Sequence, residues 1–168
     1  MKKYDQSIKD TKDGSMVIGV ISDIHGVLSS TAVRELASCD MILCAGDIER
    51  PFILDELEAI APTIAVLGNC DRQGFTGVNV PFVAMPRIIG VRFYMVHRPE
   101  DIGALPDDVQ VVIHGHTHIP REEYRDGVLY LNPGSATRPR GGSKKSLARL
   151  RVEQGSVQKV EFVELSAL

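Results

Sequence analysis

The residues that could carry out chemistry stand directly after short apolar runs of this sequence. They combine carboxylate, amide and imidazole side chains, which supply the oxygen and nitrogen donors that bind divalent cations in proteins. Seven such donors are more than one tetrahedral ion takes, but they suit two cations that share a bridging carboxylate. The candidate donors are Asp23, His25, Asp47, Asn69, His97, His116 and His118.

Each donor alone has a more ordinary explanation. The pairs Gly46-Asp47 and Gly68-Asn69 are dipeptides that usually mark turns. A single histidine such as His25 or His97 is more often hydrogen-bonded in the core or on the surface. The stretch His114-Gly115-His116-Thr117-His118 is more specific, because alternate positions of a tight loop can direct two imidazoles at one centre. The ordered combination, with each member after an apolar run, predicts a shared metal site.

The apolar runs predict the elements that position the donors. They occupy residues 17–21, 41–45, 63–67, 93–96 and 111–113. Continuous apolar runs of this length are typical of strands that are buried on both faces. Helices are expected after the capping residues Ser29–Thr31 and from Pro51 onward. The order strand–helix–strand–helix–strand predicts a parallel sheet with right-handed crossovers, and its carboxyl edge would collect the donors.

The second half of the chain has the pattern of antiparallel strands. Asp126-Gly127 lies between strand-like residues and predicts a hairpin. Residues 146–152 and 157–164 are expected to form a closing antiparallel pair. The expected fold class is therefore α/β, with two packed mixed sheets and helices outside. Residues 16–168 would form a single domain, and residues 1–15 a polar leader that is either disordered or a non-native extension.

The composition excludes several other classes of protein. In 168 residues, 19 Lys and Arg stand against 22 Asp and Glu, so the net charge of −3 gives no reason to expect specific nucleic-acid binding. No apolar run of the sequence approaches the roughly 18 residues of a membrane span. The three cysteines match no zinc-site spacing and are expected to be reduced thiols, which indicates a cytoplasmic protein.

In their order along the chain, these motifs resemble those of the calcineurin-like metallophosphoesterase superfamily. Asn132-Pro133-Gly134-Ser135 and the short chain are similar to its small microbial phosphodiesterase branch. The resemblance covers residues 16 to about 163, and it implies a four-layer α/β/β/α sandwich of two mixed sheets flanked by helices. It also implies a metal-dependent phosphoesterase. The matching residues are Asp23-Ile24-His25, Gly46-Asp47, Gly68-Asn69-Cys70-Asp71, His97 and Gly115-His116-Thr117-His118.

The resemblance further implies a role for each donor. A hydroxide that bridges two metals would attack phosphorus in line with the leaving group. Asp47, Asn69 and His97 are the residues expected to take part in catalysis. Manganese is the expected metal, while iron, zinc, nickel and cobalt suit the same donors. The first metal would be held by Asp23, His25 and His118, the second by Asn69, His97 and His116, and both by Asp47.

Residues beside the donors are expected to tune the site. Asp71 is expected to orient a ligand histidine or the ligand asparagine, and His114 to have a structural or supporting role. Cys70 stands where many members of the superfamily have a histidine that protonates the leaving group, which favours diesters over alkyl monoesters. An ordinary loop residue explains Cys70 equally well. Arg98 and Arg72 are candidate contacts to a substrate phosphate, with a solvated surface charge as the alternative.

Several functions remain open on this basis. The leading one is a phosphodiesterase that acts on a small phosphate ester, and a phosphomonoesterase would use the same site. A subunit of the retromer complex resembles this fold and works through protein contacts, so a non-catalytic scaffold is the alternative from another class. A metal-dependent hydrolase of a non-phosphate bond has no further feature in its favour. The resemblance is also compatible with a homo-oligomer.

Overall fold

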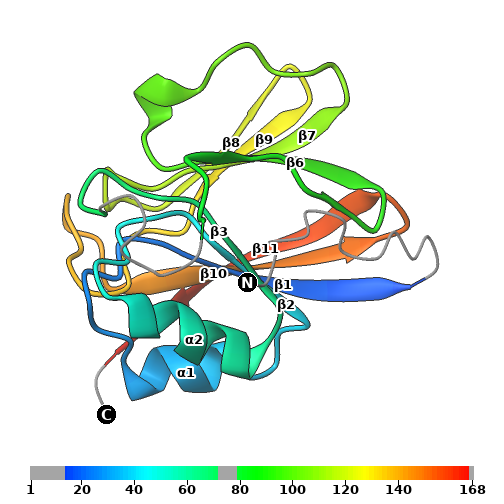
Figure 1. Cartoon of the computed structure of the whole chain (residues 1–168). Coiled ribbons are helices and arrows are strands. Elements are labelled where there is room, and N and C mark those ends of the chain that lie inside the picture. Colours follow the sequence, from blue (N-terminus) through cyan, green and yellow to red (C-terminus); the bar gives the residue numbers. More distant parts are fainter. Residues whose placement is uncertain (1–13, 72–78, 167–168) are drawn as a thin grey trace.

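Two β-sheets packed face to face form the body of the protein (Figure 1). The structure, a computed structural model, describes residues 14–71 and 79–166. The strands of the first sheet are β1 (Ser15–Ile21), β2 (Met41–Cys44), β3 (Thr63–Ala65), β10 (Ser146–Glu153) and β11 (Ser156–Glu164). Those of the second sheet are β4 (Val83–Ala84), β5 (Arg87–Ile88), β6 (Val91–Val96), β7 (Val109–Ile113), β8 (Arg121–Arg125) and β9 (Val128–Asn132).

The first sheet confirms the predicted parallel strands with intervening helices. Its strand order is β11-β10-β1-β2-β3, in which β1, β2 and β3 run parallel. Helices α1 (Ser30–Leu36) and α2 (Pro51–Ile60) connect these three strands. The Ser29 hydroxyl accepts the Ala32 N–H at 3.1 Å and caps α1, while Pro51 opens α2. The expected antiparallel pair, β10 and β11, completes the sheet.

The second sheet is also mixed, with the order β4-β6-β7-β9-β8 and β5 paired to β6. Strands β6, β7 and β9 run parallel, and the other three are antiparallel to their neighbours. The expected hairpin joins β8 to β9, and Asp126 and Gly127 both have the positive φ of a type I′ turn. Strands β4 and β5 were not expected, because each has only two residues and Pro81 and Pro86 interrupt that stretch.

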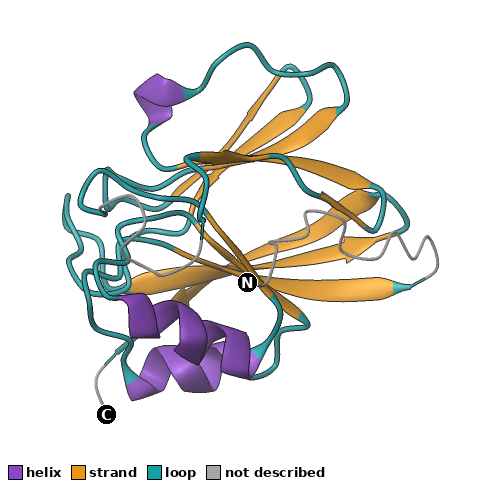
Figure 2. Ribbon diagram, viewed as in Figure 1, coloured by secondary structure: helices purple, strands orange, loops and turns teal. Residues whose placement is uncertain are grey.

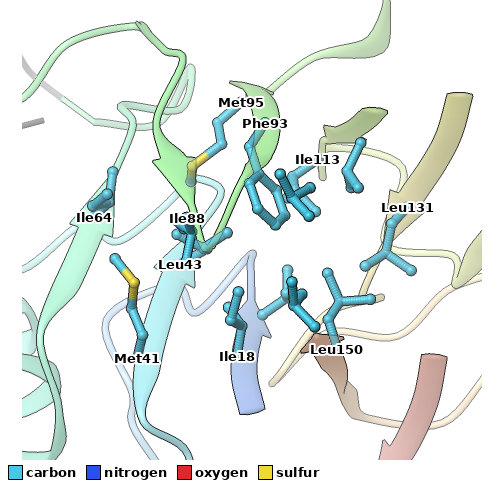
Figure 3. Packing of buried hydrophobic residues seen from close by; sticks show 14 of the residues in the cluster. Ile18, Met41, Leu43, Ile64, Ile88, Phe93, Met95, Ile113, Leu131 and Leu150 are labelled. Carbon is cyan, nitrogen blue, oxygen red and sulfur yellow. The ribbon is translucent and has the colours of Figure 1, made fainter. Parts of the chain in front are cut away.

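The main core lies between the two sheets. Figure 3 shows Ile18 and Leu43 of the first sheet opposite Phe93 and Ile113 of the second, and all four side chains are fully buried. Burying one such side chain stabilises the fold by about 1.5–3 kcal/mol. Close packing between the sheets therefore fixes the position of one set of strand ends relative to the other.

The outer faces of the two sheets are covered differently (Figure 2). Helices α1 and α2 cover the first sheet, and they bury Leu36, Ile53 and Leu57 against it. The outer face of the second sheet packs against Ile102 and Leu105, which follow the 3-10 turn η1 (Pro99–Asp101). The α/β fold with two mixed sheets is thus confirmed. Among the described residues, the α-helical cover lies on the first sheet alone.

Two further expectations concern the ends of the chain and membrane insertion. Residues 1–13 of the expected leader lie outside the described residues, so the leader and the domain boundary at residue 16 stay predictions. Within the described ranges, no helix has the length and the apolar character needed to cross a membrane.

Candidate metal centre

Loops that follow strands of both sheets gather at one edge of the molecule, on the left in Figure 1. Parallel strands end on the same side of a sheet, so β1, β2 and β3 deliver their loops together, as do β6 and β7 of the second sheet. The loops carry Asp23 and His25 after β1, Asp47 after β2, Asn69 after β3, His97 after β6, and His116 and His118 after β7.

The backbone of these loops is strained. Among the described residues, nine that are not glycine have a positive φ, and six of the nine lie in these loops. A left-handed conformation costs such a residue about 1–3 kcal/mol and persists where the surrounding structure enforces it. The strain indicates that side-chain direction, rather than stability, determines these conformations. The six residues are Asp23, His25, Asp47, Glu49, His116 and His118.

Two glycines allow the loops to approach one another closely. A Cβ atom at Gly115 would collide with the Ser22 hydroxyl, and one at Gly68 would collide with the Asp47 carboxylate. Any side chain at either position would therefore displace the acidic residues. Close packing explains why glycine precedes the asparagine of one motif and separates the histidines of the other.

Asp23 is fully buried and held through one of its two carboxylate oxygens. Its Oδ2 accepts the Ser22 hydroxyl at 2.9 Å and the His116 N–H at 3.1 Å. Its Oδ1 has no hydrogen-bond partner among the described residues and lies 3.2 Å from His118 Nε2 and 3.7 Å from His97 Nε2. The first oxygen thus fixes the carboxylate, and the second faces the centre of the site.

Asp47 is held in the same way. Its Oδ1 accepts the Cys70 N–H at 2.9 Å, while Oδ2 lies 3.2 Å from His97 Nε2 and 3.8 Å from His25 Nε2. Burial opposes ionisation, but contact with His97 and the Cys70 N–H lowers the pKa of Asp47 to about 2. Burial likewise disfavours the charged form of His97, yet Asp47 and Asp23 raise the pKa of its imidazole. Asp47 is therefore an ionised carboxylate between two histidines.

Three of the candidate histidines are anchored through Nδ1. His25 donates from Nδ1 to Glu49 Oε1 at 2.7 Å. His97 and His118 donate from Nδ1 to backbone carbonyls, at 2.6 and 2.5 Å. An oxygen acceptor requires the proton on Nδ1, so Nε2 of the neutral ring keeps its lone pair. In its neutral form, each of the three rings therefore offers an unprotonated Nε2 as a ligand atom.

The innermost donors fit a divalent cation. Ligand atoms of Asp23, His25, Asp47 and His118 lie within 4.8 Å of one another, and all four residues are buried. His25 Nε2 and His118 Nε2 face each other at 3.3 Å. Two imidazole lone pairs at this separation repel unless a cation or a proton lies between them. Donor atoms that are each about 2.0–2.2 Å from one cation are themselves about 3–4 Å apart. His25 Nε2, His118 Nε2 and Asp23 Oδ1 fit this spacing, with separations of 3.2, 3.3 and 3.9 Å.

Asn69 and His116 form a more exposed part of the site. Asn69 is exposed at the rim, and the His116 side chain is 36% exposed. His116 Nδ1 lies 3.1 Å from Asn69 Oδ1, and the centre of its ring lies 5.4 Å from that of His97. Its Nε2 lies 3.7 Å from Glu100 Oε1. The structure thus brings all seven predicted donors to one edge, five of them buried and two on the rim.

Asp71 supports the loops through their backbone. Its carboxylate accepts N–H groups of Ile48 at 2.9 Å, Glu49 at 2.7 Å and Gly68 at 2.8 Å. These bonds tie the loop after β2 to the loop after β3. Asp71 was expected to orient a ligand histidine or Asn69; its bonds go to the backbone next to Asp47 and next to Asn69.

His114 and Cys70, the other expected neighbours, differ in their surroundings. His114 is buried, with Nδ1 bonded to the Gly115 carbonyl at 3.1 Å and Nε2 to Arg121 at 3.1 Å. Both of its ring nitrogens are therefore engaged outside the donor set. Cys70 lies exposed on the rim. Partial desolvation and the charge of Asp47 raise the pKa of the Cys70 thiol to about 11.

Arg98, a candidate phosphate contact, is paired with an acid. Its guanidinium donates to both carboxylate oxygens of Asp101, at 2.8 and 3.1 Å. This bidentate contact raises the pKa of Arg98 and lowers that of Asp101. The pairing does not favour a phosphate contact by Arg98. Arg72, the second candidate, lies outside the described residues.

Glu49 is a site residue that the sequence analysis missed. Its Oε1 anchors His25, and Asp71 holds its backbone N–H in a conformation with positive φ. Its only signal in the sequence is an acidic residue two positions after Asp47. Contact with a histidine 24 positions away becomes visible only in the folded chain.

The segment that starts at Asn132 braces two of the ligand loops. Asn132 Nδ2 donates to the Gly115 carbonyl at 3.1 Å and to Thr117 Oγ1 at 2.9 Å. The buried Ser135 hydroxyl donates to the Asp23 carbonyl at 2.8 Å. The motif Asn132–Ser135 therefore holds the backbone beside Asp23 and beside the His116 loop.

Known proteins share these motifs and this fold. The calcineurin-like phosphoesterase superfamily domain matches residues 16–155 of the chain. The chain belongs to this superfamily. Probable metallophosphoesterase MJ0623 of Methanocaldococcus jannaschii is 34% identical over 157 residues, which cover 83% of this chain and 78% of that protein. Phosphodiesterase YfcE of Escherichia coli (strain K12) is 31% identical over 155 residues, which cover 77% of this chain and 84% of the relative.

Solved structures agree with this assignment. The phosphoesterase YfcE from E. coli has a TM-score of 0.68 at 25% identity, with 87% of this chain and 98% of that chain covered. Vps29 of Cryptosporidium parvum has a TM-score of 0.71 at 19% identity, with 90% and 100% covered, and shares the fold. The resemblance of the motifs to this superfamily and to its small microbial members is therefore confirmed. Membership of the superfamily supports a hydrolase that binds metal.

Proposed function

We propose that the protein is a phosphodiesterase that binds two divalent metal ions at the seven donors. The observation that carries the proposal is the pair of buried Nε2 atoms of His25 and His118, 3.3 Å apart beside the unpartnered Oδ1 of Asp23. Buried polar atoms without partners are unfavourable, and a bound cation would make the same arrangement favourable. Membership of the superfamily supports the same conclusion.

The proposed division of the donors is the one that the motifs of the superfamily imply, with Asp47 in both sets. Its Oδ2 lies 3.8 Å from His25 Nε2 and 3.2 Å from His97 Nε2, so it is within reach of a donor of each set. Two divalent cations bound here would lower the pKa of a water nucleophile and neutralise the charge that builds up on the phosphoryl oxygens. Manganese is the first metal to test, although iron, zinc, nickel and cobalt suit the same donors. The first set is Asp23, His25 and His118, and the second is Asn69, His97 and His116, of which Asn69 and His116 lie at the rim and His97 is buried.

The chain itself supplies orientation and access. The bonds to Nδ1 of the histidines and to one oxygen of each aspartate hold the buried donors before any ligand binds. The exposed side of Asn69 and His116 leaves the rim open to a phosphate ester, and the Asn69 amide can donate a hydrogen bond to a phosphoryl oxygen. Substrate would therefore enter over the rim.

A diester is the substrate class that the rim favours. The thiol of Cys70 is a weaker proton donor than the histidine of many relatives, so esters with good leaving groups are preferred. Arg98 is paired with Asp101 and offers no free charge for the second negative charge of a monoester. The name of the relative YfcE, phosphodiesterase, points the same way. The free thiols of Cys39, Cys44 and Cys70 fit the proposed cytoplasmic location.

Hydrolysis of bis(p-nitrophenyl) phosphate beside p-nitrophenyl phosphate tests this function. Metal-stripped protein would be assayed alone and after addition of manganese, with Asp47→Asn as the control. We expect manganese-dependent turnover, faster for the diester and lost in the variant. Turnover of the monoester alone would indicate a phosphomonoesterase. Inert protein across several metals would indicate a non-catalytic scaffold, the alternative from another class.

A further inference from the structure

A cavity of about 390 Å³ opens beside the rim of the metal centre. Asn69 and His97, two of the proposed ligands, are among the residues that line it. Leu67, Val83, Val96 and Phe82 form the apolar part of its lining, here called the apolar wall. Its volume lies within the range of about 300–1,000 Å³ that is common for small-molecule sites. Any group attached to a phosphate at the metal centre would be close to this cavity.

The apolar wall is part of the framework of the fold. Val83 of β4 lies opposite Val96 of β6 in the second sheet. Leu67 follows β3 of the first sheet, and its N–H donates to the Pro81 carbonyl at 2.9 Å. That bond joins the two sheets immediately before Phe82. The wall is therefore already formed in the free protein.

Phe82 is the part of the wall that is most open to solvent. Its side chain is 53% exposed, whereas Phe93 is fully buried. Covering such an exposed apolar ring with a ligand is favourable, because it removes apolar surface from water. An aromatic ligand group binds more favourably against Phe82 than an alkyl group of similar size, because offset stacking of the two rings adds to the burial of apolar surface.

The charged groups that line the cavity are already paired. Arg98 and Asp101 are bonded to each other, so among the described lining residues no unpaired arginine or lysine is present to bind a second anion. The cavity is therefore suited to an uncharged group rather than to another phosphate or carboxylate. Together with the exposed ring, this points to an apolar, planar occupant.

We infer that the cavity binds an aromatic ester group of the substrate, with the phosphodiester at the metal centre and the ring against Phe82. The inference builds on the proposed function and names its substrate class. Phe82 is then a specificity-determining residue that contacts the ester group and takes no part in bond cleavage. Hydrolysis of the ester adds one water molecule and yields a phosphate monoester and an alcohol or phenol.

Isothermal titration calorimetry with two poorly hydrolysed diesters tests the inference. Manganese-loaded full-length protein would be titrated with diphenyl phosphate and with dimethyl phosphate. We expect diphenyl phosphate to bind about tenfold more tightly or better. Phe82→Ala should lose most of this preference, while Phe82→Tyr should keep it. Phe52→Ala is the matched control, because Phe52 is 47% exposed on α2 and outside the cavity lining.

The outcomes separate this inference from the proposed function. Equal affinity for the two diesters, binding of neither at millimolar concentration, or an unchanged preference in Phe82→Ala would overturn the inference. Turnover of bis(p-nitrophenyl) phosphate in that case would leave the phosphodiesterase intact. A preference that depends on Phe82 but comes without turnover of any diester would support the cavity and contradict the phosphodiesterase.

Discussion

The buried and the exposed halves of the metal site differ in how firmly the protein holds them. In the buried half, Asp23, His25 and His118 are each at most 8% exposed, and each is fixed by a hydrogen bond on the side away from the centre. In the exposed half, His116 and Asn69 hold each other across 3.1 Å at the rim. In the proposed two-metal site, one metal position would thus be built in advance, whereas Asn69 and His116 would complete the other at the surface, beside the buried His97.

This contrast has a functional meaning. A preorganised set of donors binds a cation with little loss of conformational entropy, whereas exposed side chains must be ordered first. We therefore expect the buried position to bind metal more tightly. Asn69 and His97 line the cavity, so in the proposed site the exposed position is the one that would meet the substrate. Single substitutions at the donors and at their hydrogen-bond partners test this expectation.

Asp47→Asn should have the largest effect, because Asp47 is the residue that joins the two halves. An amide supplies no negative charge, so neither half would keep its cation well. We expect turnover of bis(p-nitrophenyl) phosphate to fall by more than about 100-fold, beyond the 10–100-fold typical of residues that only support a ligand. Metal content by mass spectrometry should fall in parallel. Turnover near that of the wild type would remove Asp47 from the site.

His116→Ala and His118→Ala should separate the two positions. His116→Ala should lose most turnover but keep one tightly bound metal ion and its fold, because the side chain is 36% exposed at the rim. His118→Ala should lose the tight ion, because His118 belongs to the buried donor cluster. Equilibrium dialysis against manganese and circular dichroism would measure both effects. Equal metal affinities in the two variants would show that the buried and the exposed positions do not differ in how tightly they bind metal.

Glu49→Gln should weaken metal binding through His25. A neutral amide makes a weaker hydrogen bond to His25 Nδ1 than the carboxylate at 2.7 Å. We expect the affinity for the tighter manganese ion to fall by about 10–100-fold. The exposed Glu56 of α2 provides a matched control as Glu56→Gln, which should bind metal as the wild type does. Identical affinities in the two variants would show that Glu49 has no positioning role.

Arg98→Ala should have the smallest effect. Arg98 is bonded to Asp101 and exposed, and surface pairs of this kind contribute little to stability. We expect kcat/KM for the diester to change by less than about threefold, which corresponds to less than about 0.7 kcal/mol. A loss of tenfold or more would restore Arg98 as a phosphate contact and weaken the argument for an uncharged cavity.

Donors at strand ends could be predicted from the sequence because the signal is local. Each apolar run ends within three residues of a donor, so the runs before Asp23 and Asp47 revealed both the strand and its polar end. Parallel order then required those ends to meet. The same reasoning failed for β4 and β5, whose two-residue length leaves no periodic pattern.

Contacts between distant segments could not be predicted in the same way. Glu49 reaches His25 only because Asp71 fixes the backbone between the two loops. The pairing of Arg98 with Asp101 depends on the 3-10 turn at Pro99–Asp101, which no pattern in the sequence predicted. The cavity beside Phe82 needs both sheets to be in place. Such features depend on tertiary structure rather than on local spacing.

The most direct test of the two-metal account is a manganese titration of metal-stripped protein that follows binding and diester hydrolysis together. We expect two ions per chain, the first bound more tightly, and turnover that rises with the second. The first ion should also raise the melting temperature by about 5–10 °C at 100 times its Kd. Full activity with a single bound ion, or two ions bound without any hydrolysis of bis(p-nitrophenyl) phosphate, would contradict the account.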